Sequence, residues 1–240
     1  MKARAFVGLD LARTVPSAAA AQFFPPAREF LEIVPVPIFM ARLDLFLLLQ
    51  GQVRRVAHAI DSIFIDRWSA RAMSGLAISE AEIMVLFEAA RWAPSSGNNQ
   101  PWRMLYALRD SSHWPLFLGL LNEGNRRWAQ QGGALVLFIS KLTLADGRPS
   151  RTHAFDTGAA WENFALQGTQ RNLVVHGMQG FDYDRARSEL KIPPEYEVDA
   201  IAVVGKAADT QQLPEDLRAR ERPNDRRPLA DTVRAGPFSF

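Results

Sequence analysis

The chain has 240 residues, of which 48% are hydrophobic and 22% charged, and this composition suits one domain with a sizeable core plus an extension. The net charge of +2 is too small to indicate a nucleic-acid partner and is compatible with anionic small ligands. The chain lacks cysteine, which excludes disulfides, thiolate catalysis and cysteine metal sites, and its four histidines show no zinc-binding spacing. Chemistry that depends on an organic cofactor stays open, because it needs neither a thiol nor a metal.

The first 57 residues differ in character from the rest of the chain. They contain five prolines and an alanine run, whereas regular periodicity begins near Asp61. We expect residues 1–57 to form an extension that is partly disordered and lies outside the core. Residues 58–240 are expected to form one folded domain.

The most hydrophobic stretch, residues 33–50, raises the question of a membrane span. Arg42 and Asp44 lie near its middle, and both are unfavourable inside a bilayer. Near the start of the chain, Asp10 and Arg13 interrupt the hydrophobic region that a signal peptide needs. We therefore expect a cytoplasmic protein without a membrane partner.

Two helices are predicted first along the domain. Residues 61–72 fit a short helix with apolar side chains turned inward. Ser79 and Glu82 then have the spacing of a capping box, which predicts a second helix, and Pro94 is expected to stop it. The inward side chains of the first helix are Ile63, Phe64 and Trp68.

Later segments alternate irregularly between strands and helices. Asp156 and Asp182 are each placed to cap a helix, and Asn172 can adopt the left-handed conformation that ends the first of these. Helices outnumber strands without alternating with them one for one, which predicts an α+β fold. The expected strands are 104–108, 134–142 and 196–205. One expected helix starts at Trp114, a second carries Trp128, and two more start at Asp156 and after Asp182.

Arg67, Ser69 and Arg71 form the first candidate binding motif. If residues 61–72 are helical, this spacing places the two arginines on one face, with the serine between them in the sequence. Two guanidinium groups and a hydroxyl can hold a phosphate through charge-assisted hydrogen bonds. A solvated helix face explains the same spacing, so the motif decides nothing alone.

The second motif is the loop at residues 93–102, APSSGNNQPW. Its two prolines make it rigid, and its hydroxyls and carboxamides supply many donors and acceptors. Carboxamides suit the edge of a flavin or pyrimidine ring, where donors and acceptors alternate. An ordinary turn between a helix and a strand is the competing interpretation.

The third motif is the segment 176–182, HGMQGFD. Its two glycines flank Met178 and Gln179 and allow the backbone to approach a flat ligand, so that an amide can reach a flavin N5. A glycine-rich loop before the Asp182 cap is the competing interpretation. We assign no role to His176, because a single histidine is more often a core residue.

These three segments, the helix that starts at Asp156 and the tail segment RRPL at 226–229 follow one another in the order found in FMN-dependent nitroreductases. The chain resembles that family over residues 61–235, and APSSGNNQPW is the most specific segment. It departs from the family pattern at Asn172, where glycine is usual, and in its long N-terminal extension.

The resemblance implies a three-layer α+β fold, with a mixed, mostly antiparallel sheet flanked by helices, in an intertwined homodimer. FMN would lie at the dimer interface, and NAD(P)H would be a transient co-substrate. The flavin itself would carry the hydride through N5 to a small electron-poor acceptor such as a nitroaromatic or a quinone, by a ping-pong reaction. Neither a catalytic side chain nor a metal is implied.

The resemblance also implies roles for individual residues around the flavin. Arg67 and Ser69 would bind the phosphate, and Arg71 would face the N1/O2 edge of the ring. Arg226 would close on the phosphate from the tail, with Arg227 as the alternative.

The ring itself would be held from both subunits. Gln179 and Gly180 would offer backbone amides near N5 and O4. The residues that would line the ring from the partner subunit are Pro94, Ser95, Ser96 and Asn98.

Other functions remain compatible with these residues. A relative of the same fold can carry out different flavin chemistry, such as reductive dehalogenation or flavin fragmentation, and a third possibility is a non-enzymatic FMN-binding protein. A nucleic-acid role for the arginine-rich tail is disfavoured, because the tail lacks interleaved aromatic residues.

Overall fold

The computed structural model describes residues 54–240. The stretch at 33–50 and nearly all of the expected extension at 1–57 therefore lie outside the described residues. Within residues 54–240, no helix is both long enough and apolar enough to cross a membrane.

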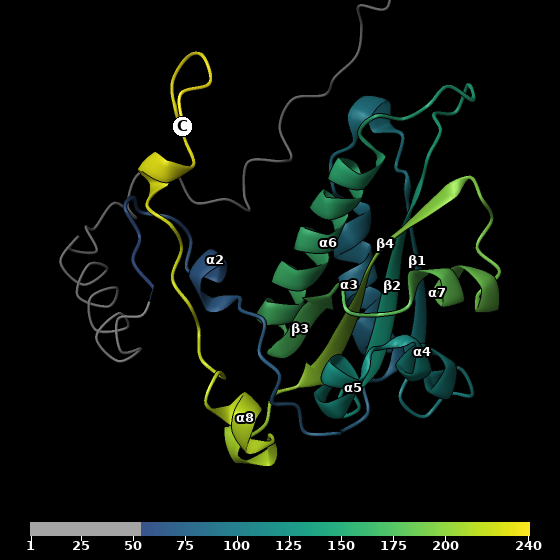
Figure 1. Ribbon diagram of the computed structural model, residues 1–240, viewed down its shortest axis with the longest axis vertical. Helices are drawn as coiled ribbons and strands as arrows, with labels where there is room; N and C mark the ends of the chain where they lie inside the picture. Colours follow the sequence, from purple (N-terminus) through teal and green to yellow (C-terminus); the bar gives the residue numbers. More distant parts are fainter. Residues whose placement is uncertain (1–53) are drawn as a thin grey trace, which may run out of the picture. The chain divides into compact units, whose positions relative to one another are not determined.

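The centre of the domain is a four-stranded sheet in the order β1-β2-β4-β3 (Figure 1). Each of the three neighbouring pairs is antiparallel. β2 is buried along nearly its whole length, which explains why its sequence is an unbroken apolar run rather than an alternating one. The strands are β1 (Trp102–Leu108), β2 (Ala134–Lys141), β3 (Leu173–Met178) and β4 (Tyr196–Lys206).

Helices cover both faces of this sheet (Figure 1). One layer packs through Phe164, whose ring is fully buried among Leu86, Val136 and other apolar residues. The opposite layer encloses a second cluster around the buried Trp128. The predicted three-layer α+β fold is thereby confirmed. The first layer consists of α3 (Glu80–Arg91) and α6 (His153–Gln170), and the second of α4 (Trp114–Leu120), α5 (Glu123–Ala129) and α7 (Tyr183–Glu189).

The predicted capping box at the start of α3 is confirmed. The Ser79 hydroxyl accepts the amide N–H of Glu82 at 3.2 Å, and the Glu82 carboxylate accepts the Ser79 amide at 2.8 Å. These bonds satisfy backbone donors that lack a partner within the helix. α3 ends at Arg91, before Pro94, as expected.

We expect Ser79→Ala to lower the free energy of unfolding by about 1 kcal/mol, because it removes this cap. Urea denaturation measures the change. Ser79→Asp is the matched control, since aspartate also caps, and it is expected to stay near the wild-type value. An equal loss in both variants would show that the cap is not the source of the stability.

The prediction of one helix over 61–72 is wrong. α2 (Ile63–Asp66) has only four residues, and the chain leaves the helix at Arg67, whose ψ of 119° is extended. Phe64, expected to face inward, is 53% exposed. One turn is too short to sustain a helix without further packing, and the next amides bond elsewhere in the fold.

Two boundaries later in the chain also differ from the sequence expectation. α6 starts at His153 rather than at Asp156, which lies in the first turn as a buried carboxylate. Part of the segment expected to be a glycine-rich loop, 176–178, is instead the end of β3, where Gly177 pairs with Ala202 of β4. Glycine weakens the strand signal, and the pairing with β4 overrides it.

Other local predictions are confirmed. The side chain of Asp182 accepts the amide of Arg185 and caps α7. Asn172, just after α6, has a φ of +56°, the left-handed conformation predicted for it. The chain then continues from β4 through α8 (Glu215–Arg218) into the C-terminal tail.

Candidate functional site

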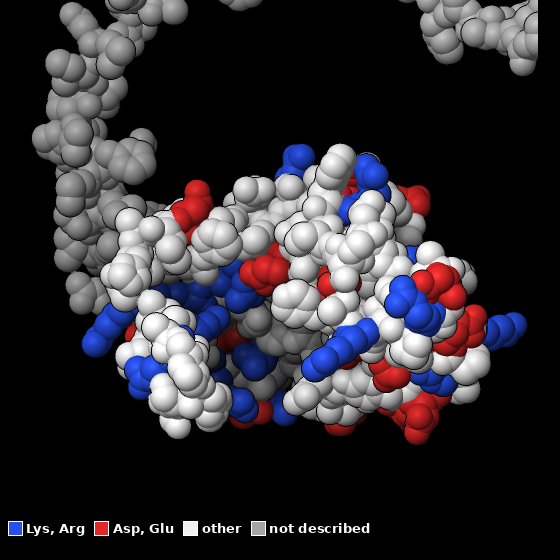
Figure 2. Space-filling model, turned by 90° about the horizontal axis from the view of Figure 1, so that it is seen from above, with Lys and Arg blue, Asp and Glu red and all other residues white. Residues whose placement is uncertain are grey.

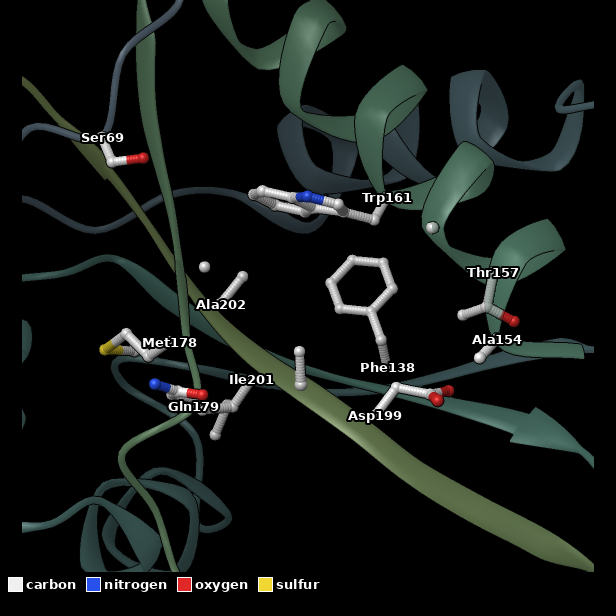
Figure 3. Close-up of a pocket in the computed structure, with 13 residues that line it drawn as sticks. Ser69, Phe138, Ala154, Thr157, Trp161, Met178, Gln179, Asp199, Ile201 and Ala202 are labelled. Atoms are coloured by element: carbon white, nitrogen blue, oxygen red, sulfur yellow. The ribbon is translucent and has the colours of Figure 1, made fainter. Parts of the chain in front are cut away.

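A cavity of about 380 Å³ opens between the first half of α6 and the strands β3 and β4 (Figure 3). Its position follows from small residues on β4, because Ala200 and Ala202 leave space under the helix. The lining is largely apolar, with four polar side chains. The residues that line it are Ser69, Phe138, Ala154, Thr157, Gly158, Trp161, Gly177, Met178, Gln179, Asp199, Ala200, Ile201 and Ala202.

The polar groups lie at two separate ends of this cavity. Ser69 and Gln179 are at one end in Figure 3, and Thr157 and Asp199 are at the other. The aromatic rings of Phe138 and Trp161 lie between them, 5.8 Å apart and nearly perpendicular. A flat apolar ligand with polar groups at its rim suits this arrangement.

Two glycines keep the cavity open. A Cβ at Gly177 would lie only 3.2 Å from the Trp161 ring. A Cβ at Gly158 would meet nothing within 4 Å, so the surface of α6 toward the cavity has no side-chain atoms at that point. A side chain at either position would fill space that a flat ring system needs.

Two of the residues predicted to bind the flavin, Ser69 and Gln179, line the cavity, whereas Gly180 lies just beyond it. The Gly180 carbonyl accepts hydrogen bonds from the amide of Asn122 at 3.1 Å and from Nδ2 of Asn125 at 3.0 Å. A Cβ at Gly180 would approach both asparagine side chains to within 2.6 Å. Glycine is therefore needed for this packing, whichever ligand binds.

The structure brings the two predicted phosphate-binding arginines close to a third, Arg54. Nη1 of Arg54 donates to the carbonyl of Arg67 at 2.9 Å. Burial lowers the pKa of Arg54, and the positive charges of Arg226 and Arg67 lower it further. Nε of Arg54 is buried without a hydrogen-bond partner. A cluster of cations with an unsatisfied donor fits an anionic group such as a phosphate.

Two residues of the arginine cluster already have polar partners within the chain. Nε of Arg67 is 3.8 Å from the carboxylate of Glu162 on α6, and the Arg67 side chain is 14% exposed. Arg226 is exposed on the tail and donates to the side chain of Asn224 at 3.2 Å. On the face shown in Figure 2, basic side chains gather in a hollow, while acidic and basic groups are mixed elsewhere.

Arg71 lies in a different setting from Arg67. Its guanidinium group is 3.5 Å from the carboxylate of Glu221 and lies over the ring of Trp128, with 5.8 Å between the guanidinium carbon and the ring centroid. Glu221 also accepts the backbone amides of Arg71 and Ala72. The tail residue Glu221 is thus the counter-ion of Arg71, and Arg71 does not line the cavity.

His176 is a packed residue, as expected. Its Nδ1 is 2.9 Å from the carbonyl of Ala70, and its ring lies 4.5 Å from that of Trp128. Burial lowers the pKa of His176, so the neutral form is favoured at neutral pH. Its hydrogen bond to Ala70 helps to fix the backbone between Ser69 and Arg71.

The loop 93–102 lies at the start of α6. The amide of Ser96 donates to the carboxylate of Asp156 at 3.2 Å, and the amide of Gln100 donates to the Ser95 hydroxyl at 3.0 Å. Pro94 and Asn98 are exposed. None of the four predicted ring-lining residues of this loop faces the cavity of its own chain, so their contact with a partner's ligand stays a prediction.

Several residues at the site carried no recognised sequence signal. Trp161 and Phe138 read as ordinary core aromatics, and Thr157 is one of many hydroxyls. Asp199 lies inside a segment expected only to be a strand. Its charge does not set it apart in the segment YEVDAIAVVG, because Glu197 two positions earlier carries the same charge and would share its face in a regular strand.

Comparisons with known proteins agree with this fold and site. The model of the nitroreductase family matches residues 65–127, which include the first two motifs. A solved structure described as an oxidoreductase containing FMN is 42% identical, with a TM-score of 0.75, over 78% of this chain and 96% of its own. A nitroreductase family protein from Clostridium difficile 630 shares the fold at 19% identity and a TM-score of 0.58, over 75% of this chain and all of its own.

A further relative comes from Streptomyces coelicolor. Its name assigns it a proposed NADH dehydrogenase/NAD(P)H nitroreductase activity, and it is 35% identical over 77 residues, which are 32% of this chain and 38% of its own. The chain belongs to the nitroreductase family.

Proposed function

We propose that this protein is an FMN-dependent oxidoreductase that passes a hydride from NAD(P)H to a small electron-poor acceptor, such as a nitroaromatic or a quinone, in a ping-pong reaction. The observation that carries this proposal is the cavity, a largely apolar slot beside Trp161 with Ser69 and Gln179 at one end (Figure 3). The proposal is also supported by the solved structure that is 42% identical to this chain, which is described as an oxidoreductase containing FMN.

The residues of this chain fit FMN in two ways. The arginine cluster of Arg54, Arg67 and Arg226 supplies charge for the phosphate, and the unsatisfied Nε of Arg54 supplies a donor. Gly177 and Gly158 leave room for a ring system. When bound, FMN supplies the two-electron chemistry, because its ring accepts a hydride and returns it.

The protein's own groups have three tasks in this proposal. Ser69 and the arginine cluster bind the phosphate, and the backbone around Gln179 and Gly180 orients the ring. Trp161 and Phe138 exclude water from the slot, which strengthens every polar contact inside it. Arg71 and Glu221 together fix the segment that carries Ser69.

Dimer formation belongs to the same proposal. We infer that a second copy places Pro94, Ser95, Ser96 and Asn98 against the bound ring, because these residues do not serve the cavity of their own chain. Size measurement in solution, with and without FMN, tests this assembly.

The visible absorption spectrum tests the proposed function. The purified protein is expected to be yellow, or to become so with FMN, and to bleach when NADH or NADPH is added anaerobically. Riboflavin is the matched control ligand, because it lacks the phosphate and is expected to bind much more weakly. A colourless protein that does not bind added FMN refutes the proposal. A yellow protein that neither NADH nor NADPH bleaches favours non-enzymatic flavin binding.

A further inference from the structure

β4 carries one extra residue where it passes the cavity. Phe138 of β2 pairs with Ala200, but the next residue, Ile139, pairs with Val198, so Asp199 has no partner across the ladder. Such a β-bulge turns a side chain away from the regular alternation of a strand. Here it places the carboxyl group of Asp199 in the lining of the cavity (Figure 3).

The carboxyl group is poorly satisfied in that position. Its Oδ2 atom is buried and has no hydrogen-bond partner. At the same end of the cavity, Oγ1 of Thr157 is also buried without one. Unsatisfied buried oxygens are costly, and they are retained mainly where a ligand or a reaction uses them.

A row of polar side chains leads from Asp199 away from the cavity. The hydroxyl of Ser140, which is fully buried on β2, acts on the carboxyl group of Asp199 and lowers its pKa. Oγ of Ser140 is in turn 2.8 Å from Nδ1 of His153. His153 is the first residue of α6 and is half-buried, so the row extends from the cavity toward solvent.

Burial of Asp199 favours its protonated form and is the largest effect on its pKa, which it raises. The Ser140 hydroxyl and the charge of His153 lower this pKa by smaller amounts. The charge of Glu197 on the same strand raises it and is the smallest of the four effects. Burial raises the pKa of Tyr183 on α7, and the charge of Asp199 raises it further.

We propose that Asp199, Ser140 and His153 form a relay that delivers a proton from solvent to the acceptor, which would share the cavity with the flavin. The relay rests on the proposed function, because a two-electron acceptor A needs a proton as well as a hydride: NAD(P)H + H⁺ + A gives NAD(P)⁺ + AH₂. The hydride leaves the acceptor with a negative oxygen. Asp199 gives its proton to that oxygen and takes another from the Ser140 hydroxyl, which is resupplied through His153.

The decisive experiment compares two acceptors with the reduced enzyme. A quinone takes up protons with its electrons, whereas ferricyanide takes up electrons only. Asp199→Asn is expected to slow reoxidation by the quinone about a hundredfold, the lower range for loss of a general acid, and to leave reoxidation by ferricyanide within about twofold. Ser140→Ala is expected to slow the quinone reaction as well, since it interrupts the relay while leaving Asp199 in place.

Glu197→Gln is the matched control. This carboxylate lies two residues before Asp199 on β4, but its side chain is 51% exposed and does not line the cavity. It is expected to leave both reactions within about twofold, as surface substitutions do. In wild type, the quinone reaction is expected to slow as the pH rises and Asp199 loses its proton, and Asp199→Asn is expected to lack that dependence.

Stability gives a readout that requires no flavin. Because the folded state raises the pKa of Asp199, its stabilising effect is present below the unfolded pKa and is lost as the pH rises through the folded pKa. Asp199→Asn should therefore gain in melting temperature, relative to wild type, between acid and neutral pH. The Glu197→Gln variant should show a smaller change.

The outcomes separate the relay from the proposed function. If Asp199→Asn slows reoxidation by quinone and by ferricyanide equally, Asp199 has a structural role only. If it slows neither reaction, Asp199 takes no part in the reaction. Both results overturn the relay. Failure of wild type to bleach with NADH or NADPH instead overturns the proposed function, while the dependence of stability on pH still reports the burial of Asp199.

Discussion

Arg67→Ala is expected to weaken FMN binding by about a hundredfold. A charge-assisted hydrogen bond contributes about 1.5–3 kcal/mol, and each 1.4 kcal/mol is a factor of ten in Kd. The Arg67 side chain is only 14% exposed and lies beside Arg54, so water cannot readily replace its charge. Titration of the apoprotein with FMN, followed by flavin fluorescence, measures the change.

Two further variants make this measurement specific. Arg67→Lys keeps the charge but loses the planar fork, and it is expected to fall between wild type and Arg67→Ala. Arg91→Ala is the matched control, because Arg91 is an exposed arginine at the end of α3 that pairs with Glu88 and lies over the ring of Trp92. If riboflavin binding falls as much as FMN binding in Arg67→Ala, the residue does not act on the phosphate.

Glu221→Ala is expected to lower the free energy of unfolding by about 2–3 kcal/mol. The Glu221 side chain is 1% exposed and accepts three donors: the guanidinium of Arg71 and the amides of Arg71 and Ala72. Removing the Glu221 carboxylate leaves the Arg71 guanidinium and two buried amides unsatisfied. The free energy that this costs exceeds the net stabilisation by the ion pair. The Arg71 side chain is 23% exposed, which keeps the estimate below that for a fully buried pair.

Urea denaturation of a double-mutant cycle checks the origin of this loss. If the unpaired guanidinium causes part of it, Arg71→Ala combined with Glu221→Ala should cost less than the sum of the single variants. Glu215→Ala, in the exposed first turn of α8, is the matched control and should change stability by less than about 0.5 kcal/mol. Strict additivity would show that Glu221 acts through the backbone amides alone.

Local signals in the sequence were sufficient for much of the fold. The capping box at Ser79, the Asp182 cap and the left-handed Asn172 are decided by residues within three or four positions of one another. The strand β2 was predictable from its unbroken apolar run of residues. These signals lie in neighbouring residues, and this is why they could be recognised without knowledge of the fold.

The errors fall where a distant partner decides the local structure. Residues 67–72 carry a helical spacing, but the amides of Arg71 and Ala72 bond to Glu221, roughly 150 residues further along the chain. The strand at 173–178 was hidden by its glycine until β4 supplied the pairing. Arg54, on the extension side of the predicted boundary at residue 57, contacts the carbonyl of Arg67.

The candidate site divides in the same way. The amino-acid sequence identified candidate residue types: arginines suited to a phosphate and glycines that permit a close approach. The family resemblance added Ser69 and Gln179, which line the cavity. The contact of Trp161 with the cavity, the pairing of Arg71 with Glu221 and the bulge that places Asp199 in the cavity became visible in the folded chain alone. Residue types can be taken from single positions, whereas burial, pairing and strand register exist only once separate segments have packed together.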